Sequence, residues 1–130
     1  MSSKKFLGID YGAARIGLAT ADSDSQLARP HGAVNAAGLV ELIKREGPFD
    51  VVVVGLPRGL DGQDTPQTLA VRHFTDDVLG PLNIDPVFQD EAGTSGVAES
   101  RLKEAGKPFA KPDIDAEAAS IILQDYLDSL

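Results

Sequence analysis

Four consecutive valines, Val51–Val54, constrain the fold of this chain more than any other feature. A strand with one solvent-facing side alternates apolar and polar residues, whereas this run is apolar throughout, so both of its faces must be covered. Such strands are typical of the interior of a parallel sheet that has helices on both faces. Asp50 precedes the run and Gly55 follows it, which bounds the strand on both sides. We therefore expect an α/β fold.

The rest of the chain divides into alternating strand and helix patterns. The first two strands form a hairpin around a turn at Tyr11–Ala14, and strand–helix units follow it, which favours a mixed five-stranded sheet with helices on both faces. The other strands are predicted over 6–10, 15–21, 32–34 and 85–89. The helices are predicted over 37–45, 64–79, 94–105 and 116–127.

Local signals mark the ends of these helices. Asn35 is positioned to cap the first helix, and Gln67 is positioned to complete a capping box in the second. The third begins at Thr94 or Ser95 and turns Ala98, Leu102 and Ala105 inward, and Asp113 or Asp115 caps the last. Glycine, proline and lysine residues at 106–112 predict a loop before that last helix.

Length and composition narrow the class of protein. A chain of 130 residues fits one domain, here spanning 1–130, and can bury a substantial core. The sequence has no cysteine, which excludes disulfides, thiolate zinc sites and cysteine nucleophiles. No apolar run reaches the length of a membrane span, and the start of the chain does not resemble a signal peptide. We expect a cytoplasmic protein without a membrane partner, either a monomer or a homodimer.

The chain is strongly acidic. Its 12 Lys and Arg residues against 20 Asp and Glu residues give a formal net charge of −8. Proteins that bind nucleic acid usually carry a basic surface, so this charge argues against that class. A metal site built from carboxylates nevertheless adds negative charge that bound cations cancel locally.

Acidic residues stand where the predicted elements end or begin. Asp10 ends the first strand, Asp90 and Glu91 follow the last strand, and Asp113 and Asp115 open the last helix. The carboxyl ends of parallel strands face one crevice, so these side chains can converge there. Clustered carboxylate oxygens suit Mg²⁺ or Mn²⁺, and two such ions about 4 Å apart would support phosphodiester hydrolysis. Each residue alone also has a simpler explanation, as a turn residue, a solvated loop or a helix cap.

The segment GLPRGLDGQDTP at 55–66 is the second unusual stretch. It reads either as a tight connector or as a loop that approaches a phosphate backbone, with Arg58 as the cation. It lacks the lysine and the spacing of a phosphate-binding P-loop. Neither His31 nor His73 stands in a pattern that suggests catalysis.

Taken together, these segments resemble the YqgF (RuvX) family of Holliday-junction-resolvase-like proteins, which are also described as nucleases of precursor 16S rRNA. The resemblance covers nearly the whole chain, and the Gly-Leu-Pro…Asp-Gly…Pro spacing is its most specific part. The matching segments are GIDYGAARIGLA at 8–19, ARPHGAV at 28–34, VVVGLPRGLDGQDTPQT at 52–68, FQDEAGTS at 88–95 and DAEAASIILQDYL at 115–127.

The resemblance implies an RNase H-like fold and a nuclease site that depends on Mg²⁺ or Mn²⁺. The family's acidic residues correspond to Asp10, Glu91 and Asp115, with Asp90 and Asp113 as candidates for a further carboxylate ligand. The implied substrate is structured nucleic acid, with the 5′ end of precursor 16S rRNA first and branched DNA as the alternative.

Four basic residues are candidates for phosphate contacts: Arg15, Arg58, Lys107 and Lys111. A solvated surface position is the simpler explanation for the two lysines.

The chain departs from the family pattern after Glu91. Ala92 replaces an arginine, Gly93 replaces a leucine, and Val97 stands where a glutamate is common. The arginine would have offered a phosphate contact or a brace for the carboxylates. A non-catalytic nucleic-acid-binding module is therefore an alternative to a nuclease. A fragment of a sugar-kinase or actin-like ATPase is a third reading, but those proteins close two related domains around a nucleotide.

Overall fold

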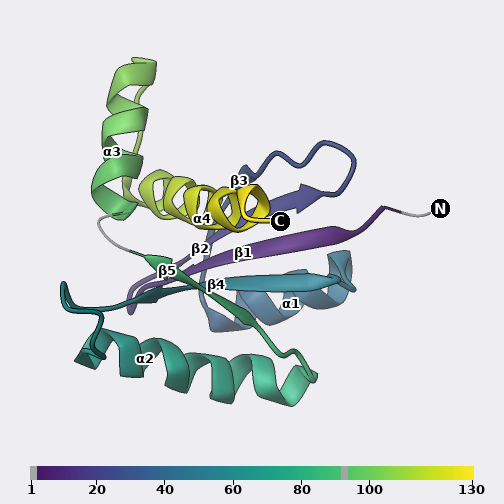
Figure 1. Ribbon diagram of the computed structural model, residues 1–130. Coiled ribbons are helices and arrows are strands. Elements are labelled where there is room, and N and C mark those ends of the chain that lie inside the picture. The colour runs from purple at the N-terminus through teal and green to yellow at the C-terminus, as the bar shows by residue number, and fades with distance from the viewer. Residues whose placement is uncertain (1–2, 92–93) are drawn as a thin grey trace.

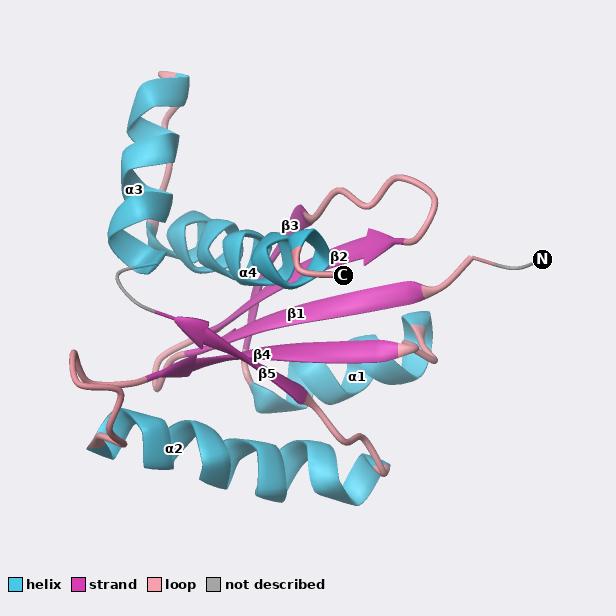
Figure 2. Ribbon diagram, viewed as in Figure 1, coloured by secondary structure: helices cyan, strands magenta, loops and turns pink. Residues whose placement is uncertain are grey.

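The computed structural model describes residues 3–91 and 94–130, which form a five-stranded sheet with helices on both faces (Figure 1). The strands are Lys5–Tyr11 (β1), Ile16–Asp22 (β2), Arg29–Val34 (β3), Val51–Pro57 (β4) and Val87–Glu91 (β5). The helices are Ala36–Glu46 (α1), Pro66–Phe74 (α2), Thr94–Ala105 (α3) and Lys111–Asp128 (α4) (Figure 2). A π-helical turn at Thr75–Leu79 and a 3₁₀ turn at Gly80–Leu82 continue α2.

The strand order is β3-β2-β1-β4-β5, and the sheet is mixed as expected. Antiparallel pairing joins β1 to β2 and β2 to β3, whereas β4 is parallel to both β1 and β5. The valine run forms most of β4, inside the sheet, and Val52–Val54 are buried. The prediction that the valine run forms a strand inside the sheet, with parallel neighbours, is therefore confirmed.

Alternation along the strands separates two apolar layers. Leu7 and Ile9 of β1 belong to a cluster that includes Leu39 of α1 and Phe74 of α2. Phe6 points to the other face, where it packs with Ala119, Ile122 and Leu123 of α4. Figure 1 shows the same layers, with α4 on one face of the sheet and α1 and α2 on the other. The even-numbered residues of β1, including Asp10, thus face α4.

The third helix packs on α4. Ala98 of α3 forms a small buried cluster with Ala118 and Ile121 of α4. Leu102 is half-buried, but Ala105 is exposed, so the expected inward stripe stops one turn early. Val97 is 47% exposed. The substitutions at Ala92 and Gly93 lie outside the described residues.

Two helix starts differ from the sequence-based expectation. Thr65 caps α2, which places Gln67 second and Thr68 third in the helix, so Thr68 completes the capping box. The hydroxyl of Thr68 is buried and also donates to the carbonyl oxygen of Pro57. Gln67 is exposed and takes no part in the capping box, because the cap is Thr65 and not Asp64.

The last helix begins five residues earlier than expected, at Lys111. Ala110 is its N-terminal flanking residue, and the carboxylate of Asp113 accepts a hydrogen bond from the Ala110 backbone N–H at 2.8 Å. Pro112 is accommodated in the first turn, where its missing N–H does not interrupt the helix. Part of the expected loop at 106–112 is therefore helical.

Other strand boundaries also shift. β3 begins at Arg29 instead of 32, and β4 continues through Leu56 to Pro57, which were expected to be loop. β5 spans Val87–Glu91 instead of 85–89, so Asp90 and Glu91 lie in the strand and do not follow it. Across the described residues, the helices do not combine the length and hydrophobicity needed to span a bilayer.

Candidate metal centre

Asp10 and Glu91 meet on the α4 face at the carboxyl ends of β1 and β5. Asp10 is paired with Gly17 of β2, and Glu91 is paired with Pro57 of β4. Phe88 of β5 packs against the opposite apolar layer, so Glu91, three residues later, faces α4. The two side chains are hydrogen-bonded to each other.

A glycine on the strand between them makes room for this contact. Gly55 of β4 follows Val54, which pairs with Ile9 of β1. A Cβ atom at Gly55 would lie 2.6 Å from Oε2 of Glu91, closer than real Cβ contacts allow. The carboxylate of Glu91 therefore lies over the bare backbone of β4, and a larger residue there would displace it.

The environment of this pair disfavours negative charge. The pKa of Asp10 is raised to about 8, chiefly by burial and in addition by the adjacent charge and hydrogen bond of Glu91 and the charge of Asp115. Burial also raises the pKa of Glu91, while the hydrogen bond from Asp10 opposes that rise. Both shifts favour a state in which the pair holds a proton, because two partly buried carboxylates in contact repel each other when both are ionised.

Asp115 approaches from the first turns of α4 but has a different partner. Its Oδ2 lies 2.6 Å from Nε of Arg15, which stands just before β2. The side chains of Arg15 and Asp115 remain 35% and 23% exposed. The charge of Asp115 reaches Asp10, but it makes the smallest contribution to the raised pKa.

Close packing fixes the backbone that carries Asp115. A Cβ atom at Gly17 would lie 2.0 Å from the carbonyl oxygen of Asp115, so only glycine admits this approach of α4 to β2. Asp10 is the cross-strand partner of Gly17. The start of α4 is therefore held beside the carboxyl end of β1.

The donor set fits a hard divalent cation. Carboxylate oxygens are the ligands that Mg²⁺ and Mn²⁺ prefer, and a cation can replace the proton that Asp10 and Glu91 hold. Within residues 3–91 and 94–130, no three acidic or histidine side chains already lie close enough to share one ion. Asp115, the expected third ligand, lies against Arg15 instead.

Two other acidic candidates are not brought to this place. Asp90 points to the opposite face of β5 from Glu91, and its side chain is 87% exposed. Asp113 lies two residues before Asp115, a spacing that places the two on opposite sides of a helix, and it is engaged with the Ala110 backbone.

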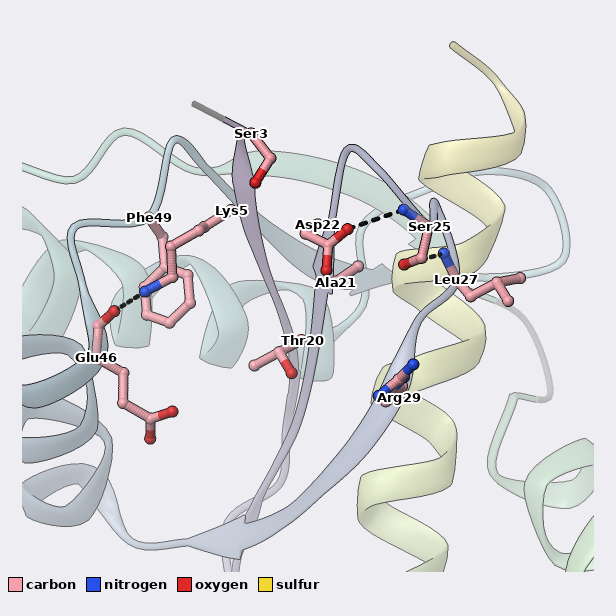
Figure 3. A pocket seen from close by; sticks show the side chains of 10 residues that line it. All are labelled: Ser3, Lys5, Thr20, Ala21, Asp22, Ser25, Leu27, Arg29, Glu46 and Phe49. Atoms are coloured by element: carbon pink, nitrogen blue, oxygen red, sulfur yellow. Dashed lines mark hydrogen bonds between the residues drawn. The ribbon is translucent and has the colours of Figure 1, made fainter. Parts of the chain in front are cut away.

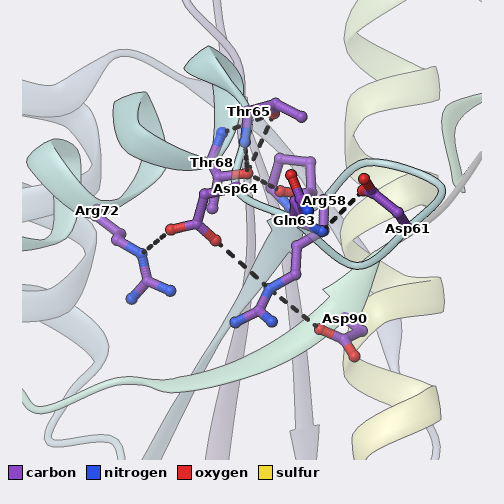
Figure 4. Close-up of polar contacts among 9 residues, drawn as sticks. Arg58, Asp61, Gln63, Asp64, Thr65, Thr68, Arg72 and Asp90 are labelled. Carbon is purple, nitrogen blue, oxygen red and sulfur yellow. Dashed lines mark hydrogen bonds and ion pairs between the residues drawn. The ribbon is translucent and has the colours of Figure 1, made fainter.

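The candidate phosphate contacts also have definite positions. Nε of Arg58 lies 4.0 Å from Asp64 and 3.9 Å from Asp90, and Asp64 in turn lies 3.8 Å from Nε of Arg72 (Figure 4). Arg58 thus braces the connection between β4 and α2. Lys107 and Lys111 are exposed at the junction of α3 and α4.

A cavity of about 360 Å³ lies at the other end of the strands. Lys5 at the start of β1, Asp22 at the end of β2 and Phe49 line it, among others (Figure 3). Nζ of Lys5 lies 5.2 Å from the centre of the Phe49 ring and donates to the last carbonyl of α1, at Glu46. None of the acidic candidates lines this cavity.

Comparison with known proteins identifies the family. The family model described as "RuvX: Holliday junction resolvase" matches residues 4–129. The chain belongs to the RuvX family. The earlier resemblance is thereby confirmed over nearly the full length.

Curated relatives of this RuvX chain carry the name "Putative pre-16S rRNA nuclease". The protein of Chloroflexus aurantiacus strain J-10-fl is 40% identical over 138 residues, which cover 99% of this chain and 90% of that protein. The protein of Chloroflexus aggregans is 39% identical over 137 residues, with 99% and 96% covered.

Solved structures confirm the predicted RNase H-like fold of this RuvX chain. Thermus thermophilus RuvC in complex with a Holliday junction substrate superimposes with a TM-score of 0.58 at 17% identity, covering 97% of this chain and 94% of RuvC. The yeast mitochondrial Holliday junction resolvase gives a TM-score of 0.53 at 13% identity, with 95% and 78% covered.

Sequence reasoning missed the close packing around the site. Gly17 and Gly55 stand inside strand patterns, and an isolated glycine there signals a close backbone approach. The partnership of Arg15 with Asp115 left no such signal, because the two residues are 100 positions apart.

Proposed function

We propose that this RuvX chain is a nuclease that uses Mg²⁺ or Mn²⁺, with two ions at the site, to hydrolyse phosphodiester bonds in structured nucleic acid. The observation that carries the proposal is the pair of hydrogen-bonded, partly buried carboxylates of Asp10 and Glu91, with Asp115 beside them. Membership of the RuvX family supports the same reading.

Asp10, Glu91 and Asp115 would hold the cation. When bound, it would activate water and stabilise the charge on the phosphate. Asp10 would give up its proton to such a cation, and Gly55 leaves space beside the carboxylate of Glu91. Arg58 keeps the β4–α2 connection beside the site, and Lys107 and Lys111 offer charges for the phosphate backbone.

Precursor 16S rRNA is the first candidate substrate because the curated relatives are named for it. Branched DNA is the second, since the family is described as a Holliday junction resolvase and the RuvC complex contains a Holliday junction substrate. We assign this protein to a class that acts on folded or branched strands.

The test is cleavage of a labelled precursor 16S rRNA fragment and of a four-way DNA junction, in Mg²⁺ and in Mn²⁺. We expect Asp10→Asn and Glu91→Gln to lose cleavage, because each removes a carboxylate from the pair. Asp90→Asn is the matched control: it removes an adjacent carboxylate on the other face of β5, and cleavage should persist.

The substrate that is cut faster distinguishes RNA from DNA. Equal residual cleavage by the wild type and by Asp10→Asn would overturn the nuclease assignment. If nucleic acid still bound, the result would favour the non-catalytic module.

A further inference from the structure

The carboxylates of the candidate centre are divided between two partnerships. Asp10 and Glu91 hold each other through a hydrogen bond, whereas Asp115 is held by Arg15. The proposed function does not explain why the guanidinium of Arg15 is paired with Asp115, the third carboxylate.

The backbone around Asp115 leaves little room for adjustment. Its carbonyl oxygen already fills the space above Gly17, so α4 cannot approach β2 more closely. The turn before β2 is tight as well, because Gly12 donates its backbone N–H to the Arg15 carbonyl oxygen at 3.0 Å. A change of partner at Asp115 must therefore come from side-chain rotation, not from movement of the helix.

Arg15 has the freedom that such an exchange requires. Its side chain is 35% exposed, so a released guanidinium can reach solvent without crossing the core. One charge-assisted hydrogen bond through Nε joins it to Asp115, and among the residues described at 3–91 and 94–130 Asp115 is its one ion-pair partner.

We propose that Arg15 is a positioning residue that acts as the built-in counter-ion of Asp115 and competes with the divalent cation for it. Asp115 would leave Arg15 to join Asp10 and Glu91 as a ligand of the cation, and the guanidinium would then be free to reach solvent. Arg15 thus weakens cation binding while stabilising the cation-free protein. This inference rests on the proposed function, because it takes the three carboxylates as the cation site.

The experiment measures Mn²⁺ affinity by isothermal titration calorimetry, with no nucleic acid present. Replacing Arg15 by Gln removes a positive charge beside the site, and we expect Mn²⁺ to bind about tenfold more tightly, the size expected for one screened charge at close range. The same variant should melt at a lower temperature in EDTA, because Asp115 loses its partner. Affinity and cation-free stability therefore change in opposite directions.

Arg101→Gln is the matched control. Nη1 of Arg101 lies 3.9 Å from Glu117, so this variant removes the same charge and another arginine–carboxylate pair with α4. Glu117 lies two residues beyond Asp115, on another side of the helix. The Mn²⁺ affinity of Arg101→Gln should stay within about twofold of the wild type, since Arg101 is paired with Glu117 and not with one of the three carboxylates of the candidate centre.

Three results would contradict the proposal. Unchanged or weaker Mn²⁺ binding by Arg15→Gln would assign Arg15 a purely structural role. Equal tightening by Arg101→Gln would indicate a general effect of net charge. A wild-type protein that binds no Mn²⁺ would overturn the proposed function itself, and this inference with it.

Discussion

At the scale of single residues, Asp10 is where burial and charge conflict most. It stands near the end of a buried strand, and its pKa is raised to about 8, first by burial and then by the carboxylates beside it. Such a carboxylate is stable when it shares a proton or when it is bound to a cation. The proton and the cation bind the same oxygen atoms, so one replaces the other.

The pH dependence of stability follows from Asp10. Below about pH 4 the folded and unfolded chains both keep its proton, and between about pH 4 and about pH 8 only the folded chain keeps it. The contribution of Asp10 to the free energy of unfolding is therefore lost as the pH rises through that window. Asp10→Asn, measured by thermal unfolding in EDTA, should flatten the decline and melt higher than the wild type at about pH 8.

Asp90→Asn provides the comparison for that measurement. This carboxylate is exposed on the opposite face of β5, so its removal should leave the decline in place. Parallel wild-type and Asp10→Asn curves would contradict the assigned environment of Asp10.

At the scale of elements, the decisive contact is the seating of α4 on the sheet. The helix carries Asp115 and contributes Ala119, Ile122 and Leu123 to the core. Its first turns touch the backbone of β2 at Gly17. The placement of α4 on the sheet therefore sets both the position of Asp115 and the packing of the core. A displacement of α4 would disturb both.

Gly17→Ala tests that seating. The new methyl group would meet the carbonyl oxygen of Asp115, and the helix would have to move, because a backbone atom cannot rotate away. We expect a loss of about 1–3 kcal/mol in the free energy of unfolding by chemical denaturation, together with weaker Mn²⁺ binding.

Gly96→Ala in α3 is the matching glycine substitution. A Cβ there meets nothing within 4 Å, so alanine should stabilise the helix by about 0.5–1 kcal/mol. Equal stability changes for the two variants would show that the contact at Gly17 is not what holds α4.

At the scale of the whole molecule, the net charge of −8 must be reconciled with a nucleic-acid substrate. Arg15 and Arg58 have carboxylate partners, whereas Lys107 and Lys111 are exposed at the α3–α4 junction. Binding then depends on the local distribution of charge and on bound cations more than on the total.

The double variant Lys107→Gln/Lys111→Gln tests this distribution. If both lysines contact phosphates, nucleic-acid binding should weaken, and the slope of log affinity against log salt should become shallower by about 1 for each lysine. Fluorescence anisotropy with Ca²⁺ in place of the catalytic ion measures this without cleavage.

Lys4→Gln/Lys44→Gln is the control pair, since it removes the same charge from exposed positions elsewhere, just before β1 and in α1. An equal change in slope for the two pairs would assign the effect to total charge alone.

The sequence by itself determined the layers of this protein. The uninterrupted valines required a strand covered on both faces, and alternation in β1 sets Asp10 on the face opposite Leu7 and Ile9. These features are local, because they depend on the period of the strand and on which side chains avoid water. The family segments extended the prediction to the RNase H-like fold and to a single domain, of which the domain assignment stays a prediction.

Tertiary structure alone decided how the acidic residues are grouped. The end of β5 carries two adjacent carboxylates, and only its register and packing show that Glu91 faces Asp10 while Asp90 faces Arg58. The pairing of Asp115 with Arg15 joins residues 100 positions apart. No local pattern encodes that distance, because it results from α4 packing against Gly17, and side-chain partners are chosen only after the backbones meet.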